Sequence, residues 1–245
     1  MKTLLNKFFG VSGGHKIISR TVAEQLQLDQ QWQDSELPQK QLEIVKRELA
    51  HIKSTHQFPA HMQALIDQVK LLTPTKPSVL EIGCSSGYYN EILQLAGVDM
   101  YYTGCDYSPA FINLAKQLYP NLPFDVCDAT ALPYQDQQFD VAISGCCILH
   151  ILDYPKAIQE TARVTKRYAL FSRTPVVHLA GTTYTKKMGY GVPMIEIIFN
   201  ETELLRHFHA AGLRVIDIIT FGKGPHLPGI KEPTFSKTYL CEKLP

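Results

Sequence analysis

The sequence feature that most constrains the fold is the stretch VLEIGCSSGY, residues 79–88. Its apolar first half predicts a short strand that is buried on both faces, as in a parallel sheet. The apolar run breaks at two glycines, and apolar residues return at helical spacing up to residue 96. The stretch therefore predicts a strand, a glycine turn and the start of a helix. Missing side chains at such a turn let a ligand approach the backbone, and free N–H groups at a helix start suit polar or anionic groups.

From residue 78 onward the pattern alternates between strand and helix, which predicts a parallel sheet with right-handed crossovers. Asn200 and Glu203 resemble a capping box at a helix start, in which each side chain caps the other's backbone N–H. We expect further strands at residues 98–105, 122–127, 139–144, 169–171, 213–219 and 237–241, and helices at residues 109–119, 154–164 and 201–211.

The residues before this alternation predict helices instead. After Pro38, apolar residues recur at helical spacing up to Ile52, and a second helix follows Pro59. We expect these helices to cover an edge or the mouth of the α/β core, and we divide the chain into an N-terminal helical extension, residues 1–73, and an α/β domain, residues 74–245. His51, His56 and His61 follow one another at five-residue intervals and do not share a helix face, so we interpret them as surface or structural residues.

Three successive predicted strands end in acids: Glu81, Asp106 and Asp128. In an open parallel sheet, ligands bind beyond the carboxyl ends of the strands. Asp106 lies at a distance from the glycine turn that suits a carboxylate accepting hydrogen bonds from ribose hydroxyls. Asp128 can accept from an exocyclic amine of a base, with the N–H of Ala129 beside it, and Glu81 can pair with an amino group. Strand ends often carry Asp for turn formation alone, but three acids in register with the turn favour a binding site.

These motifs resemble those of class I S-adenosylmethionine-dependent methyltransferases. The resemblance rests on Glu81-x-Gly83-Cys84-Ser85-Ser86-Gly87, Asp106, Cys127-Asp128-Ala129, Leu132-Pro133-Tyr134, Phe139-Asp140-Val141 with Ser144, and residues 148–163, and it covers about residues 78–172. It implies an α/β, Rossmann-like, seven-stranded and mostly parallel sheet with helices on both faces, whose last strand is antiparallel, preceded here by the helical extension.

The resemblance also implies roles for individual residues. Gly83 and Gly87 would bound the methionine pocket, and Glu81 would help to hold the amino group. Asp106 would bind the ribose hydroxyls, and Asp128 with Ala129 the adenine. Four further residues are assigned to the cofactor site by position in the motifs: Cys84, Ser85, Tyr107 and Ser144.

Two positions depart from the family's pattern. Ser85 replaces the middle glycine of the turn, which is tolerable if its φ stays below zero. Residues 166–168, Lys-Arg-Tyr, replace the usual Pro-Gly-Gly turn before the fifth strand.

Methyl transfer needs mainly the alignment of a nucleophile with the methyl group and the exclusion of water. An oxygen nucleophile also needs a base, and His150, just past the fourth strand, is the candidate; the alternative is that it only packs or holds a loop. Substrate contacts are expected from the N-terminal helices and from residues 174–199. That segment carries Tyr184 and Tyr190 among glycines and could form a lid, whereas its pair Lys186-Lys187 is interpreted as a solvated surface.

Composition limits the remaining possibilities. With 24 basic and 23 acidic residues the formal charge is +1, so no strong field recruits nucleic acid or an anionic membrane. The apolar run at the start is too short for a signal peptide, and no later run is long enough to span a bilayer. The six cysteines lack the Cys-x-x-Cys spacing of a zinc site, and they indicate no metal and a reduced, cytoplasmic setting.

The sequence therefore predicts an S-adenosylmethionine-dependent methyltransferase that acts on a small molecule and leaves S-adenosylhomocysteine. Three alternatives stay open: a non-catalytic cofactor-binding module of the same fold, a nicotinamide-dependent oxidoreductase, and a nucleic-acid methyltransferase. The glycine spacing and Asp128 argue against the second of these. The acceptor, the atom methylated and the oligomeric state are not determined by the sequence.

Overall fold

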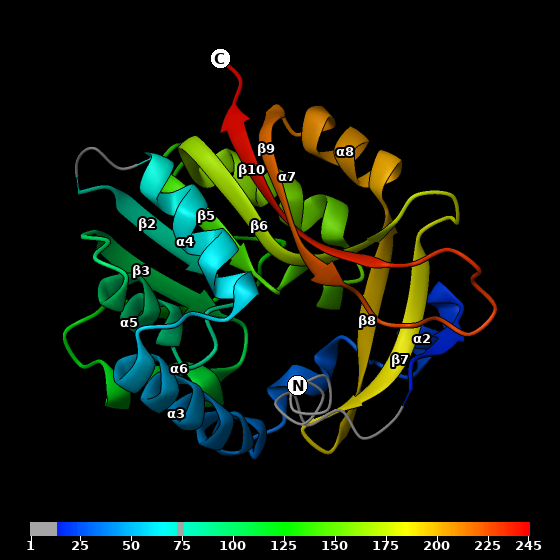
Figure 1. The fold of residues 1–245 in the computed structure, drawn as a ribbon, viewed down its shortest axis with the longest axis horizontal. Coiled ribbons are helices and arrows are strands. Elements are labelled where there is room, and N and C mark those ends of the chain that lie inside the picture. The colour runs from blue at the N-terminus through cyan, green and yellow to red at the C-terminus, as the bar shows by residue number, and fades with distance from the viewer. Residues whose placement is uncertain (1–13, 73–75) are drawn as a thin grey trace.

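A seven-stranded sheet forms the centre of the computed structural model, which describes residues 14–72 and 76–245. Neighbouring strands of this sheet, in spatial order, are β4 (Phe124–Val126), β3 (Tyr101–Asp106), β2 (Ser78–Ile82), β5 (Phe139–Gly145), β6 (Thr165–Val177), β10 (Phe235–Lys243) and β9 (Leu213–Lys223). The first five strands are parallel, and β10 runs antiparallel to both of its neighbours. The predicted Rossmann-like sheet with an antiparallel last strand is thus confirmed (Figure 1).

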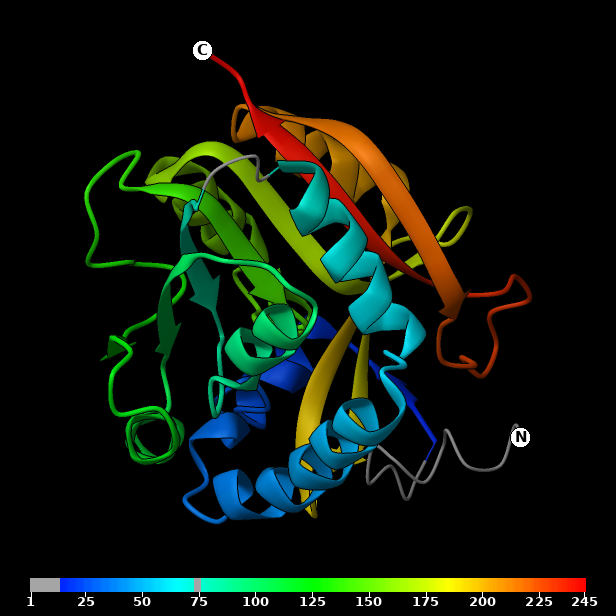
Figure 2. The ribbon, with the colours of Figure 1, turned by 60° about the vertical axis from the view of Figure 1, so that its left-hand side comes forward.

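Helices cover both faces of the sheet because alternate strand residues are apolar on each side. The helices are α3 (Leu37–Thr55), α4 (Ala60–Leu72), α5 (Tyr88–Leu95), α6 (Pro109–Leu118), α7 (Tyr154–Val164) and α8 (Glu201–Ala210). Leu170 of β6 packs with α4, whereas its neighbours Ala169 and Phe171 pack with α7 and α8. Figures 1 and 2 show α4 in front of β6, with α7 and α8 behind it.

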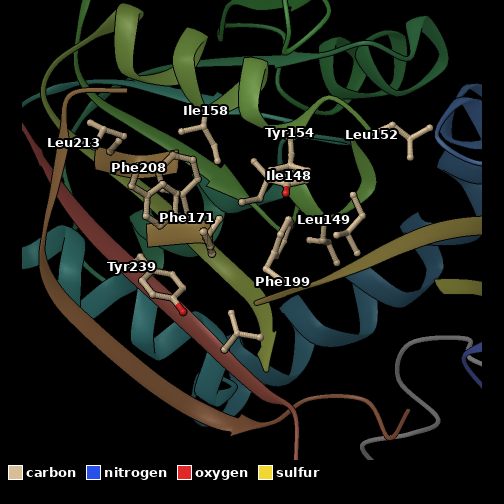
Figure 3. Close-up of a cluster of buried hydrophobic side chains, with 14 of the residues drawn as sticks. Ile148, Leu149, Leu152, Tyr154, Ile158, Phe171, Phe199, Phe208, Leu213 and Tyr239 are labelled. Carbon is tan, nitrogen blue, oxygen red and sulfur yellow. The ribbon is translucent and has the colours of Figure 1, made fainter. Parts of the chain in front are cut away.

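Aromatic rings fill the core between β6, β10 and α8 (Figure 3). Phe171 and Phe208 stack with ring centroids 4.4 Å apart, and Tyr239 lies 5.6 Å from Phe208. All three side chains are fully buried. Such packing fixes β6 firmly, which matters because this strand leads directly into the candidate site.

The two N-terminal helices predicted from periodicity are confirmed as α3 and α4, but α4 lies elsewhere than expected. Its buried residues Leu65, Ile66 and Val69 pack in one cluster with Val141, Leu170 and Leu240 of the central strands. It therefore covers the middle of the sheet and not an edge or the mouth. The division between residues 73 and 74 lies outside the described residues and stays a prediction.

Residues 174–199, which could form a lid according to the sequence, are mostly strands and not a loop. They continue β6 and then form an antiparallel hairpin of β7 (Thr183–Gly189) and β8 (Val192–Asn200), with β1 (Lys16–Ile18) on its outer edge. β8 joins the end of β6 in parallel, which extends the sheet to ten strands among the described residues. Three short elements complete this side of the molecule: α2 (Arg20–Gln25), η1 (Gln30–Gln33) and η2 (Ile148–His150).

Several predicted element ends move for local reasons. β3 starts at Tyr101 instead of residue 98 because the N–H of Val98 donates to Leu93 and closes α5 after Gly97, whose φ is +80°. The expected capping box is half formed. Asn200 Oδ1 accepts the N–H of Glu203 at 3.0 Å, but the Glu203 carboxylate accepts the hydroxyl of Thr182, which in turn caps the N–H of Asn200.

Replacing Asn200 with Ala should lower the free energy of unfolding by about 1–2 kcal/mol, because the helix loses its N-cap. The amide also donates to the carbonyls of His178 and Ala180, so the loss should fall in the upper part of this range. Urea denaturation measures the change. Ser108→Ala is the matched control, since Ser108 is the N-cap residue of α6 but makes no side-chain capping bond. An equal loss in both variants would contradict the assignment of the cap.

Candidate active site

A cavity of about 1420 Å³ lies at the carboxyl ends of the parallel strands. Its walls come from these strand ends, from the N-terminal segment and α3, and from the β7–β8 hairpin. Nine of the residues predicted for the site line it: Glu81, Gly83, Ser85, Asp106, Tyr107, Asp128, Ala129, His150 and Tyr190.

Four other predicted residues are not among the described residues that line the cavity. Cys84 is fully buried beneath the turn, and its N–H donates to the carbonyl of Cys105 at 2.9 Å. Ser144 is buried within β5, and Tyr184 packs against the core from β7. Gly87 precedes α5 with φ at +76°, and a Cβ there would lie 2.7 Å from the ring of Phe124. This glycine is therefore required by backbone geometry and packing.

The turn after β2 depends on a left-handed serine, contrary to the condition stated for it. Ser85 has φ at +48° and not below zero. Its N–H donates to Asp106 Oδ2 at 3.0 Å, while Asp106 Oδ1 accepts the N–H of Ser108 at 2.9 Å. These charge-assisted bonds compensate the unfavourable conformation. Gly83 also has a positive φ, +72°, and a Cβ there would lie 2.5 Å from Cys147 Sγ.

Two of the three acids at the strand ends are buried. Burial raises the pKa of Asp106 to about 6, against the effect of the N–H groups of Ser108 and Ser85. Glu81 is 2% exposed and accepts the hydroxyl of Tyr102 at 2.5 Å. Burial, with a smaller contribution from Asp106, raises the pKa of Glu81 to about 8. A cation that entered the cavity beside Glu81 would therefore stabilise the ionised carboxylate.

The third acid, Asp128, is exposed on the cavity wall. Its Oδ1 accepts both the N–H and the hydroxyl of Thr130, at 2.7 and 2.8 Å. Asp128 thus helps to form the turn, and together with the neighbouring Ala129 it also lines the cavity. Tyr107 donates its hydroxyl to the carbonyl of Asp29 at 2.5 Å, which ties the N-terminal segment across this part of the site.

These residues fit the cofactor that the resemblance implies. The donor set combines a buried acid for an amino group, a second acid for hydroxyls, a third acid beside a backbone N–H for a base, and a glycine turn. A typical cavity for one small molecule measures about 300–1,000 Å³. The observed 1420 Å³ therefore leaves room for a second molecule beside a cofactor.

His150 lines the same cavity. We call the part lined by Glu81, Asp106 and Asp128 the cofactor half of this cavity, and the part lined by Trp32, Arg173 and Lys187 its other half. Its Nδ1 lies 2.6 Å from the carbonyl oxygen of Ile195, which only accepts, so Nδ1 carries the proton and Nε2 keeps its lone pair. The ring packs against Trp32 at a centroid distance of 4.9 Å. Burial, reinforced by the Lys187 ammonium, lowers the pKa of His150 to about 4. The imidazole is therefore neutral at ordinary pH.

The other half of the cavity contains residues that the sequence reasoning missed or misread. Lys187 is not solvated but pairs with buried Glu196, and both line the cavity. His61 also lines it, although it was interpreted as a surface or structural residue, and burial lowers its pKa well below the usual value. The missed residues are Trp32, Tyr88, Tyr89 and Arg173. The sequence did contain one signal for Arg173: it is a charged residue close behind the apolar run of the predicted fifth strand.

Other features of the described residues bear on the function classes. No three metal-ligating side chains gather within residues 14–72 and 76–245. The six cysteines, all of which lie in the described ranges, are unpaired thiols. Over the same ranges, none of the helices combines the length and the apolar character that a bilayer crossing requires.

Comparison with known proteins agrees with this geometry. Residues 80–172 match the family described as "Methyltransferase domain". The demethylmenaquinone methyltransferase of Paenarthrobacter aurescens is 33% identical over 122 residues, which are 48% of this chain and 47% of that protein. The chain thus spans about half the length of the curated relatives it matches.

Solved structures share the fold at low sequence identity. One is 1,6-didemethyltoxoflavin-N1-methyltransferase of Burkholderia thailandensis with bound S-adenosylhomocysteine; its TM-score is 0.55 at 17% identity, covering 76% of this chain and 79% of that one. Another is the [4+2]-cyclase SpnF, with a TM-score of 0.57 at 19% identity, covering 74% and 80%. Residues 80–172 therefore match a methyltransferase-domain family, and the chain has the fold of class I S-adenosylmethionine-dependent methyltransferases.

Replacing Glu81 with Gln should flatten the pH dependence of stability in the free protein. Because the folded pKa of about 8 lies above the ordinary value of 4.5, the stabilisation is complete at low pH and is lost as pH rises through 8. Between pH 7 and 8.5, where Asp106 is mostly ionised, wild type should lose about 1 kcal/mol per pH unit. Urea denaturation measures both proteins. Glu242→Gln, at an exposed pair with Arg214, should keep the wild-type slope; an unchanged slope in the Glu81 variant would refute the buried acid.

Proposed function

We propose that this protein is an S-adenosylmethionine-dependent methyltransferase that acts on a small-molecule acceptor. The observation that supports it most directly is the gathering of Glu81, Asp106 and Asp128 with the Gly83 turn on one cavity that has room for two molecules. The spacing along the chain and the position in space agree, which a chance placement of turn-forming acids does not explain.

In this proposal each residue holds a different part of the cofactor. Glu81 takes the amino group, Asp106 the ribose hydroxyls, and Asp128 with Ala129 the adenine, while Gly83 and Ser85 form the turn around the methionine part. When bound, the cofactor supplies a methyl group on a sulfonium that is a good leaving group. The chain's own residues position the acceptor and keep water out.

A small acceptor fits the enclosure of the site. The N-terminal segment crosses the cavity through the Tyr107–Asp29 hydrogen bond, and α3 and the hairpin close other sides. The curated relative with 33% identity is named for a demethylmenaquinone, which is also a small molecule. The formal charge of +1 gives no support to a nucleic-acid substrate. A cytoplasmic location, suggested by unpaired cysteines, stays a prediction.

A second candidate is a protein of this fold that binds the cofactor without transferring its methyl group. This candidate is supported by the likeness to SpnF, because that protein shares the fold but is named for a [4+2]-cyclase reaction and not for methyl transfer. A transfer assay with labelled methyl separates the two candidates once an acceptor is found.

Calorimetric titration with S-adenosylmethionine and S-adenosylhomocysteine tests the cofactor site. We expect micromolar binding of both, weakened by about 1–3 kcal/mol in Asp106→Ala because charged hydrogen bonds are lost. Asp99→Ala is the control: it removes an exposed carboxylate between α5 and β3, and this variant should bind as wild type does. Unchanged affinity in the Asp106 variant would refute the ribose assignment. Binding of NADH in place of both compounds would favour the oxidoreductase.

We further propose that His150 acts as the general base for an oxygen nucleophile, through Nε2. With an acceptor in hand, His150→Gln should reduce kcat by about 10²–10⁴-fold, the usual contribution of a general base. Since the pKa of His150 is about 4, its protonation should not reduce the wild-type rate until the pH approaches 4. A loss of rate that tracks an ordinary histidine near pH 6.5, or full activity in the variant, would contradict this role.

A further inference from the structure

A bulge in β6 places an arginine in the acceptor half of the cavity. β10 pairs Tyr239 with Phe171 and Lys237 with Thr174, so two residues of β6, Ser172 and Arg173, face one residue of β10. Arg173 adopts a left-handed backbone, with φ at +58°. Bulges re-aim side chains, and a strained non-glycine residue in such a place is associated with function.

The position of this bulge coincides with a change of partner strands. The last residue of β6 that pairs with β5 is Ser172, opposite Gly145, and the strand then pairs with β8 from Val176 onward. Arg173 thus lies where the cofactor strands end and the hairpin begins. Figure 1 shows β6 extending from the core sheet toward β8.

Three tyrosines interact electrostatically with the guanidinium, and one of them, Tyr89, also forms a hydrogen bond with it. Tyr88 and Tyr89 stand at the start of α5 with ring centroids 4.9 Å apart, and Tyr89 is 3% exposed. Burial opposes the charge of Arg173, but Cys146 and the phenols of Tyr89, Tyr88 and Tyr190 outweigh it and raise the pKa of the guanidinium. The guanidinium therefore stays charged in the cavity.

Two glutamates lie in this part of the cavity. The carboxylate of Glu196 pairs with both Lys187 and His15. Burial raises the pKa of Glu48, and the Arg173 guanidinium lowers it in part, so this carboxyl group also interacts electrostatically with Arg173.

A second observation also indicates a ligand here. Gln41 is 8% exposed and lines the cavity, and its Oε1 has no hydrogen-bond partner among the described residues. A buried acceptor left unsatisfied costs about 1–3 kcal/mol, which a ligand hydroxyl or amine would recover. Aromatic faces complete the walls, since Trp32 lies 6.0 Å from Tyr190.

We propose that Arg173 is the specificity-determining residue of the acceptor site and that it binds an anionic oxygen of a flat, aromatic acceptor. The inference rests on the proposed function, because it takes the second half of the cavity as the acceptor site. A guanidinium is able to donate a planar pair of hydrogen bonds to a carboxylate or to an ionised hydroxyl, which suits an anionic acceptor. The aromatic walls receive the flat body of the molecule.

The chain provides its own reporter for a test. Trp32 is the single tryptophan and lies in the cavity. Its fluorescence can be followed while the protein, saturated with S-adenosylhomocysteine, is titrated with 2-naphthoate, the neutral isostere 2-naphthamide and 2-naphthol. We expect naphthoate to bind at least about tenfold more tightly than naphthamide, which corresponds to about 1.4 kcal/mol. For an ionised hydroxyl, bound naphthol should instead show the absorption spectrum of its anion.

Two variants locate the effect. Arg173→Gln should abolish the preference for the anion, and Arg173→Lys should keep part of it because the charge remains without the planar pair of donors. Arg214→Gln removes the same charge at the surface and should leave the preference unchanged. Thermal melting checks that each variant is folded.

The outcomes separate this inference from the proposed function. Normal S-adenosylhomocysteine binding with no preference for either anion in wild type, or with no naphthoate binding at millimolar concentration, overturns the role of Arg173 alone. A preference that survives in a folded Arg173→Gln overturns it as well. Failure to bind S-adenosylhomocysteine at all overturns the proposed function on which it rests.

Discussion

The buried carboxylate of Asp106 is the interaction on which the site depends. Its two oxygens accept N–H groups from Ser85 and Ser108, so one side chain joins the turn after β2 to the loop after β3. Without that bond, a left-handed serine in the turn would be costly. The same carboxylate borders the cavity. Structure and recognition thus use one group, and a change at Asp106 alters the shape of the turn as well as its chemistry.

Much of the fold follows from local patterns in the sequence. The buried run before Gly83, the regular return of apolar residues and the acids at three strand ends each reflect a short-range constraint, and the parallel sheet follows from their order. The antiparallel direction of the last strand was predicted from the family resemblance and not from local patterns. The predicted ends of helices and strands were wrong where a capping or tertiary hydrogen bond determines them, as at Val98, whose N–H donates to Leu93.

The site was less predictable because several of its properties are long-range. The φ of Ser85 is set by a carboxylate 21 residues away, and the turn sequence carries no sign of it. Arg173 belongs to the site only because β10 and β6 pair out of register there. Lys187 was expected in solvent since its partner Glu196 is on the other strand of a hairpin that the pattern did not predict.

The bulge at Arg173 gives the domain a modular design. Upstream, β6 belongs to the cofactor half, and the family match ends at residue 172. Downstream, the same strand pairs with β8 of the hairpin and with the start of β10. The outer strands of the hairpin side, β7 and β1, are separated from β5, β2 and β3 by β8 and β6 in the sheet, so changes in them do not touch the pairing of the cofactor strands. One cofactor platform can thus be fitted with exchangeable acceptor walls, and redesign of selectivity in this protein should start on the hairpin side of that bulge.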